Sequence, residues 1–211
     1  CRNPLLLNCA DEKVHLDLLK GEQRTPEYLA INPFGRVPAI VEEDGFILFE
    51  SSTVLKYLCN TRDVPDNWYP KDPRKRSQVD LFFDWYQVAT KSFSAYFYSQ
   101  HPDIPNRVPV VEDPLELLEK TLGDLEKTFL RDRKFLAGEE ISLADIQIIF
   151  FFGNLERVKY ELTKFPALRE WKDRVLATDI KPEYEKYIVD ANEAFEGIKK
   201  SIKANQAGTG K

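Results

Sequence analysis

The stretch that decides the fold is Asn32-Pro33-Phe34-Gly35-Arg36-Val37-Pro38-Ala39-Ile40, together with Phe49-Glu50-Ser51-Ser52 shortly after it. The first four residues form a turn signal, and residues 37–41 are an apolar strand that contains a proline. Asp44-Gly45 is typical of a hairpin turn, and residues 46–49 read as the returning strand. A helix is then expected to open at residues 50–53. The segment therefore predicts a β-hairpin that leads directly into a helix.

The residues before this hairpin complete the first domain. Asn3 and Pro4 are typical of a helix start. Residues 14–18 alternate apolar and polar side chains, which predicts a strand, and residues 20–24 read as a polar loop. Thr25 and Pro26 are a cap and a first-turn proline for a short helix that ends at Ile31. Residues 1–60 thus read as the latter part of a βαβ–ββα unit without its first strand.

The residues after the hairpin predict a linker and then helices. Residues 61–73 are rich in proline and aspartate, as linkers are. Helices are expected at residues 74–100, 115–130, 166–176 and 182–202, and a disordered tail at 205–211. A further buried helix is expected to begin at Ser142, because Ser142 and Asp145 have the spacing of a capping box. The predicted organisation is an α/β domain over 1–60, a linker over 61–73 and an all-helical domain over 74–204.

Composition excludes several classes of function. The formal net charge is -5 and the pI is about 5.3, which argues against nucleic acid as a partner. The three cysteines and two histidines show no metal-binding spacing, so no metal site is expected. The odd, sparse cysteine count indicates a reducing compartment, and we expect a cytoplasmic protein. No apolar run is long enough for a membrane span, so no membrane association is expected.

Four segments in the same order resemble the soluble glutathione transferases. The segments 32–40 and 49–52 are similar to the glutathione site of that family. Phe135-Leu-Ala-Gly138 with Ile141-Ser-Leu-Ala-Asp145 resembles the core of its C-terminal domain. The segments 17–22 and 68–73 are similar to the theta class in particular. The resemblance spans nearly the whole chain.

The resemblance implies a fold and an activity. The fold would be a thioredoxin-like N-terminal domain followed by an all-helical C-terminal domain. The protein would conjugate the thiolate of glutathione to hydrophobic electrophiles, as a cytoplasmic detoxifying homodimer. Glutathione would be a co-substrate, and no other cofactor is implied. Lowering a thiol pKa by about two units needs only about 2.7 kcal/mol of differential interaction.

The resemblance also implies a binding site around the hairpin. An extended tripeptide can pair with the backbone of Val37, and in the family the following proline is cis, which we expect for Pro38. Glu50 and Ser51 stand at a predicted helix start, where a carboxylate is favoured, and Ser51 would hold the γ-glutamyl carboxylate. The alternatives are an ordinary edge-strand proline and a serine at position 51 or 52 that is only an N-cap.

Three further residues are candidates by position in the family pattern. Gln23 and Arg36 fall where a histidine and a lysine usually face the glycine carboxylate. Arg36 keeps the cation, whereas Gln23 keeps only a hydrogen-bond donor. Lys91 falls where theta-like enzymes tend to hold an arginine near the thiol or the second substrate. All three are equally compatible with solvated surface positions.

The catalytic hydroxyl of theta-like enzymes would lie about three residues before Cys1. The chain contains no methionine, so we expect either that the sequence begins inside a longer natural protein or that processing has removed its start. Two alternatives stay open. One is a transferase-like binding or assembly module without catalysis, and the other is a thiol transferase that uses Cys1. Cys9 and Cys59 are expected to be inert core residues.

Overall fold

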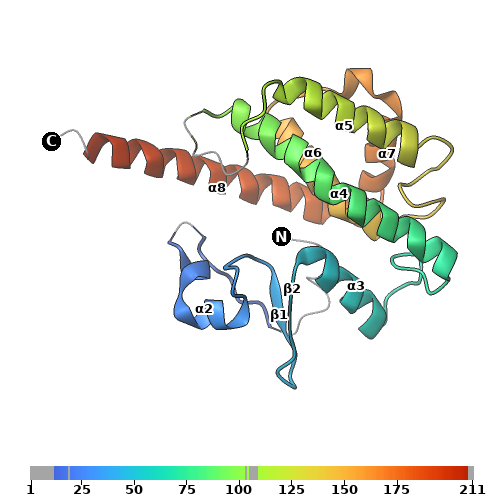
Figure 1. Cartoon of the computed structure of the whole chain (residues 1–211), viewed down its shortest axis with the longest axis horizontal. Helices are drawn as coiled ribbons and strands as arrows, with labels where there is room; N and C mark the ends of the chain where they lie inside the picture. Colours follow the sequence, from blue (N-terminus) through green and yellow to red (C-terminus); the bar gives the residue numbers. More distant parts are fainter. Residues whose placement is uncertain (1–11, 19, 103, 105–108, 209–211) are drawn as a thin grey trace. The chain divides into compact units, whose positions relative to one another are not determined.

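A computed structural model of the chain describes residues 12–18, 20–102, 104 and 109–208. The chain divides into two compact units, Cys1–Tyr69 and Pro70–Lys211. The division falls within the segment 61–73 that the sequence predicts as a linker. Figure 1 shows the order of the elements along the chain.

The first unit is built on a hairpin and the helices beside it. Its elements are η1 (Glu22–Arg24), α2 (Pro26–Ile31), β1 (Ala39–Val41), β2 (Ile47–Phe49) and α3 (Ser51–Thr61). The predicted cap of α2 is confirmed, because the Thr25 side chain accepts a hydrogen bond from the Tyr28 N–H. Helix α3 packs on both strands and buries Val54, Leu55 and Leu58. Its apolar face therefore forms the core of this unit.

The hairpin closes as the sequence predicts. Strands β1 and β2 are antiparallel, with Ala39 opposite Phe49 and Val41 opposite Ile47. Gly45 has a φ of 85°, which glycine adopts without steric cost. Arg62, the C-cap of α3, donates from Nη2 to both carboxylate oxygens of Glu42, at 2.7 and 2.8 Å. This ion pair ties the end of the helix to the turn of the hairpin.

Two predictions for the residues before the hairpin are wrong. Residues 14–18 form no strand, because alternation alone supplies no neighbouring strand to pair with. Two of their apolar side chains are exposed to solvent, since Val14 is 78% and Leu18 is 49% exposed. Part of the predicted loop is the 3-10 helix η1. The helix predicted from Asn3 and Pro4 lies outside the described residues, as do Cys1 and Cys9.

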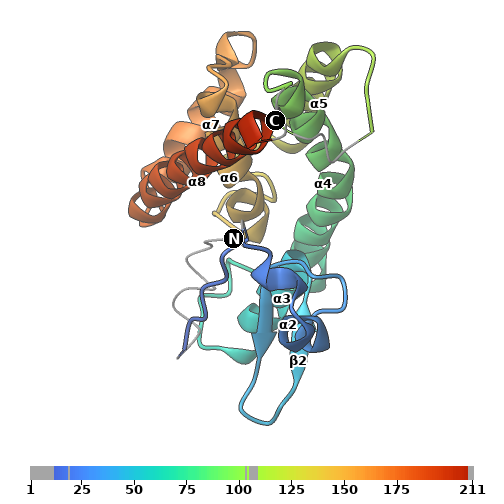
Figure 2. The same ribbon diagram turned by 90° about the vertical axis from the view of Figure 1, so that its left-hand side faces the viewer.

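The second unit is helical, as predicted. It contains α4 (Pro73–Ser99), α5 (Pro114–Phe129), α6 (Leu143–Arg157), η2 (Leu162–Lys164), α7 (Pro166–Leu176) and α8 (Lys181–Gly208). Helix α6 packs against α4, α7 and α8, which makes it the centre of the unit. Figure 2 shows these helices from a second side. Helix α8 continues to Gly208, which is four residues into the predicted disordered tail. The good helix formers alanine, lysine and glutamine in 203–207 favour this continuation.

The predicted capping box at the start of α6 is confirmed. Asp145 is fully buried, and its carboxylate accepts hydrogen bonds from the N–H and Oγ of Ser142, the N–H of Leu136 and the Nε1 of Trp171. Burial raises the pKa of Asp145, and these four donors oppose that rise. The aromatic side chains of α4 fill the adjacent core, with Phe82, Phe83, Tyr86, Phe93 and Tyr96 buried. The start of α6 is therefore fixed to two neighbouring segments by one carboxylate.

None of the helices in the described part of the chain is both long enough and apolar enough to cross a membrane.

Candidate functional site

The hairpin brings the two ends of the predicted binding segment together. Strands β1 and β2 pair residue by residue, and Ala39 lies opposite Phe49 in the pair farthest from the turn. Val37 comes two residues before Ala39 and Ser51 two residues after Phe49, so both lie just beyond this last pair. Val37 and Ser51 therefore flank the same open end of the hairpin.

The main chain at Val37 is available to a ligand. Val37 is half-buried and lies just before the paired part of β1. Within the described chain neither its N–H nor its C=O makes a hydrogen bond. The Val37–Pro38 peptide bond is cis, which confirms the expectation for this proline. Unpaired main-chain groups beside a strand are the groups to which an extended peptide can add.

The start of α3 presents the second part of the site. Its N-cap is Glu50, whose side chain makes no capping hydrogen bond, so neither Ser51 nor Ser52 is the N-cap. Glu50 has a φ of 70°, in the left-handed region that a non-glycine residue rarely adopts. Such conformations cluster where the backbone serves a ligand. The first N–H groups of a helix have no partner within the helix, and they attract a carboxylate.

Gln23 and Arg36 belong to two segments that pack on each other. Gln23 lies in η1, and its carbonyl oxygen would be only 2.8 Å from a Cβ added to Gly35, the neighbour of Arg36. The side-chain Oε1 of Gln23 is buried and has no hydrogen-bond partner among the described residues. The guanidinium of Arg36 is exposed and makes no ion pair in the described part of the chain. The Arg36 guanidinium is thus open to a new partner, whereas the Oε1 of Gln23 is a buried acceptor.

Two residues that the sequence analysis missed hold the turn before Val37. Tyr28 donates its hydroxyl to the carbonyl oxygen of Arg36 at 2.6 Å, and Asn32 donates its side-chain N–H₂ to the same oxygen at 2.8 Å. The Oδ1 of Asn32 also accepts from the N–H of Phe34 at 3.1 Å. An asparagine that bonds to the backbone two residues later is a familiar turn device. That signal was present in the sequence for Asn32, and none was present for Tyr28.

The other candidates lie elsewhere. Lys91 lies on α4 in the helical unit, where its side chain is exposed. Cys1, the alternative nucleophile, lies outside the described residues. Cys59, which we expected in the core, is partly exposed on α3. Residues 12–18, 20–102, 104 and 109–208 contain no group of three His, Cys, Asp or Glu side chains that is placed to hold a metal ion.

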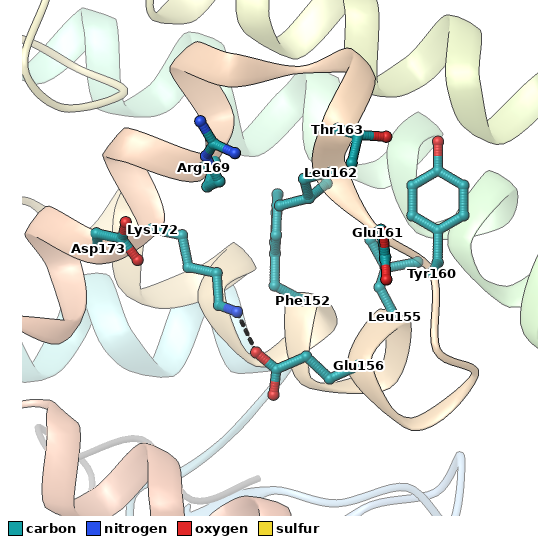
Figure 3. A pocket seen from close by; sticks show the side chains of 10 residues that line it. All are labelled: Phe152, Leu155, Glu156, Tyr160, Glu161, Leu162, Thr163, Arg169, Lys172 and Asp173. Carbon is teal, nitrogen blue, oxygen red and sulfur yellow. Dashed lines mark hydrogen bonds and ion pairs between the residues drawn. The ribbon is translucent and has the colours of Figure 1, made fainter.

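A separate pocket of about 320 Å³ lies in the helical unit, between the end of α6, η2 and α7. Figure 3 shows Phe152, Leu155 and Leu162 on its walls together with several charged side chains. Lys172 forms an ion pair with Glu156 across this space. None of the residues predicted to bind glutathione lines it. Its charged lining differs from the mostly apolar pocket that a hydrophobic co-substrate favours.

Two family profiles match the chain. The profile described as "Glutathione S-transferase, N-terminal domain" covers residues 2–61, which include the whole hairpin site. The profile described as "Glutathione S-transferase, C-terminal domain" covers residues 86–179. Together they match one segment in each of the two compact units.

Curated proteins and solved structures agree with these matches. The human protein "Glutathione S-transferase theta-2" is 36% identical over 168 residues, which are 77% of this chain and 68% of that protein. Mouse "Glutathione S-transferase theta-3" is 34% identical over 172 residues, which are 77% and 70% of the two chains. A delta-class glutathione transferase from Nilaparvata lugens superposes with a TM-score of 0.76 at 30% identity, over 94% of each chain. A human theta-class transferase bound to the glutathione conjugate of 1-menaphthyl sulfate gives 0.73 at 31% identity, over 87% of this chain and 79% of that chain.

Proposed function

Because this chain belongs to the glutathione S-transferase family, we propose that it conjugates the thiolate of glutathione to hydrophobic electrophiles through a site at the open end of its hairpin. In this reaction a carbon–sulfur bond forms while the leaving group departs with its electron pair. Glutathione is the co-substrate. No observation on the described residues favours a module without catalysis or a thiol transferase that uses Cys1.

One observation carries the assignment of the site. Val37, with its unbonded main-chain groups, and Ser51, at the start of α3, each lie two residues beyond the Ala39–Phe49 pair at the open end of the hairpin. An extended tripeptide spans roughly 10 Å, which is long enough to reach across the end of a two-stranded hairpin. Glutathione has an extended backbone and a carboxylate at each end. Its shape and its charges therefore match the two features that the hairpin brings together.

In the proposed complex each feature binds one part of glutathione. The main chain of Val37 pairs with the cysteinyl part, as an added strand would. Ser51 and the first N–H groups of α3 hold the γ-glutamyl carboxylate, and Glu50 interacts with the same end of the ligand. Main-chain pairing fixes the position of the cysteinyl sulfur, which is the reacting atom.

The opposite carboxylate is assigned to the second pair of residues. Arg36 is an exposed cation without an ion pair among the described residues, so it is available to the glycine carboxylate. Gln23 contributes a side-chain amide from η1, which packs on the same turn. Lys91 is proposed to act on the thiolate or on the second substrate. A cation near a thiol lowers the thiol pKa.

We further propose a detoxifying role in the cytoplasm and assembly as a homodimer. The small number of cysteines supports a reducing compartment. On α4, Leu81 is 51% and Val88 is 67% exposed, although both are apolar. Residues seven apart lie on one face of a helix, so this pair supports an interface with a second copy of the chain.

Calorimetric titration of the full-length protein with glutathione tests the proposed site. We expect saturable binding at millimolar glutathione and a rise in the unfolding temperature. The change Ser51→Ala should weaken binding about 10-fold, because a hydrogen bond to a charged group contributes roughly 1.5–3 kcal/mol. Glutathione that produces neither heat nor thermal stabilisation would overturn the proposal.

An exposed serine near the start of another helix provides the control. Ser77 is exposed and is the fifth residue of α4, and within the described chain its hydroxyl makes one hydrogen bond, to the carbonyl of Arg74. The change Ser77→Ala should leave glutathione affinity unchanged. Equal losses in both variants would show that Ser51 has no specific role in binding.

A further inference from the structure

We propose that Tyr28 and Asn32 are positioning residues of the glutathione site, which together hold the peptide plane between Arg36 and Val37. This inference rests on the proposed function, because it concerns the main-chain N–H that would meet the tripeptide. Neither residue is proposed to touch glutathione. Each acts through the backbone of the turn before β1.

The first observation is a carbonyl that accepts two side-chain hydrogen bonds. The Tyr28 hydroxyl lies 2.6 Å and the Asn32 Nδ2 lies 2.8 Å from the carbonyl oxygen of Arg36. The two donors come from different places, since Tyr28 lies on α2 and Asn32 is its C-cap residue. Burial raises the pKa of Tyr28, so its hydroxyl stays protonated and remains a donor. Two donors from two different residues restrict the direction of the carbonyl group more than one donor can.

The second observation is that the donors are themselves fixed. Asn32 is only 1% exposed, its N–H donates to the carbonyl of Tyr28 at 2.8 Å, and its own carbonyl accepts from Gly35 at 2.8 Å. Its Oδ1 accepts from the N–H of Phe34, which also fixes the orientation of its amide group. Each polar atom of the Asn32 side chain therefore has a defined partner in the turn.

The third observation is that the turn has no room to move toward η1. Arg24 donates from Nη1 to the carbonyl of Phe34 at 3.2 Å. Gly35 has a φ of 57°, and a Cβ added there would meet both Arg24 Nη1 and the carbonyl of Gln23 at 2.8 Å. The turn is consequently held from η1, from α2 and from within itself.

These contacts determine the direction of the Val37 N–H. A peptide group is planar, and in the trans form its N–H points away from its C=O. Fixing the carbonyl of Arg36 therefore fixes the N–H of Val37, which makes no hydrogen bond within the described chain. The two donors also polarise the peptide group, which strengthens the N–H as a donor. The N–H is thus oriented before a ligand arrives.

Steady-state kinetics and calorimetry on full-length variants test this proposal. Tyr28→Phe removes only the hydroxyl, and Asn32→Asp keeps the acceptor for Phe34 while it removes the donor to Arg36. Because a residue that is less ordered before binding loses more conformational entropy on binding, we expect each change to weaken glutathione binding about three-fold and the double change about 10-fold. The KM for glutathione should rise, whereas kcat at saturating glutathione and the KM for the electrophile should stay within about two-fold.

Tyr57→Phe is the matched control, since Tyr57 lies on α3 of the same unit and its hydroxyl makes no hydrogen bond among the described residues. The amide resonance of Val37 gives a second readout, because it should shift and broaden in Tyr28→Phe and stay in place in Tyr57→Phe. Should Asn32→Asp fail to fold, Tyr28→Phe alone decides the question. Unchanged affinity and an unchanged Val37 resonance in Tyr28→Phe would overturn the positioning role. Absence of glutathione binding by the unmodified protein would instead overturn the proposed function.

Discussion

At the scale of single residues, Asp145 is a fully buried carboxylate of the helical unit that accepts four hydrogen bonds. Its Oδ1 accepts from Leu136 N at 2.9 Å and Trp171 Nε1 at 2.7 Å, and its Oδ2 accepts from Ser142 N at 2.9 Å and Oγ at 3.1 Å. One carboxylate thus joins the start of α6 to the preceding link and to α7. The sequence predicted the local half of this arrangement through the Ser142–Asp145 spacing. It gave no sign of the bond to Trp171, because contacts between distant segments leave no periodic pattern.

We predict that Asp145→Asn lowers the free energy of unfolding by roughly 2–4 kcal/mol. Asparagine has the same shape, but its N–H₂ group would face donors that now point at a carboxylate oxygen. A buried donor without an acceptor loses its hydration and gains nothing in return. Urea unfolding followed by far-UV circular dichroism measures the change.

The control for this prediction is Asp132→Asn. Asp132 has a side chain that is 85% exposed, and its nearest ion pair, with Arg131, is equally open to solvent. Exposed pairs of this kind contribute little, so the change should leave stability within about 0.5 kcal/mol of the unmodified protein. Asp145→Asn with an unfolding free energy similar to that of Asp132→Asn would contradict the assigned role.

At the scale of elements, the ends of α4 and α6 meet the middle of α8 around the rings of Phe97 and Phe195. The ring of His101, just beyond α4, lies 4.9 Å from that of Phe97 and 4.6 Å from that of Phe195 on α8. The guanidinium of Arg157, the last residue of α6, lies 5.4 Å from the Phe195 ring, and the Lys199 ammonium lies 4.5 Å from it. Burial lowers the pKa of His101 below its ordinary value of 6.5, Lys199 and Arg157 lower it further, and Glu196 opposes them.

Because His101 lies in this cluster, we predict that the free energy of unfolding decreases in acid. Because the pKa of His101 is lower in the folded protein than in the unfolded chain, the unfolded chain binds the proton first as the pH falls. The stabilisation from neutral His101 is therefore present above pH 6.5 and is lost as the pH falls through the folded-state pKa. We predict that His101→Phe, which keeps the ring contacts, shows a smaller loss of unfolding free energy between pH 7.5 and 5.5.

The other histidine of the chain makes the comparison specific. His15 is exposed and lies in the first unit. His15→Phe should follow the pH dependence of the unmodified protein in urea titrations at both pH values. If His101→Phe and the unmodified protein lose equal free energy on acidification, the cluster does not titrate as argued.

At the scale of the whole molecule, the two units differ in how far the sequence predicts them. In the helical unit a period near 3.6 and clear start signals, such as Pro73 and Ser142, define the starts of the helices to within one or two residues, whereas the end of α8 lies six residues beyond its predicted position. In the first unit the alternation of apolar and polar residues at 14–18 wrongly predicted a strand, because a strand needs a neighbouring strand that the local sequence does not specify. The hairpin that carries the proposed site was nevertheless predictable from its turn signals. The two hydrogen bonds from Tyr28 and Asn32 to the carbonyl of Arg36 were not predictable, because they depend on where α2 packs.

The remaining question at this scale is how copies of the chain associate. Leu81 and Val88 lie seven residues apart on α4, and both are more than half exposed, while the buried residues of the same helix face α5 and α6. Isolated exposed apolar residues are common on protein surfaces. Two on one face of a long helix are less common, and a helical partner would bury them together. The proposed homodimer is therefore best tested at this face.

We predict that the double change Leu81→Lys and Val88→Lys converts a dimer into a monomer, as measured by light scattering after size-exclusion chromatography. Burial of two unpaired ammonium groups should weaken association at least about 100-fold, or about 2.7 kcal/mol. The matched control is Val110→Lys with Val189→Lys, since these residues are 90% and 56% exposed and lie on other segments. The control should remain dimeric, and unchanged circular dichroism should show that both variants are folded. A dimer that persists in the α4 variant would place the interface on another surface, whereas dissociation of both variants would attribute the effect to added charge alone.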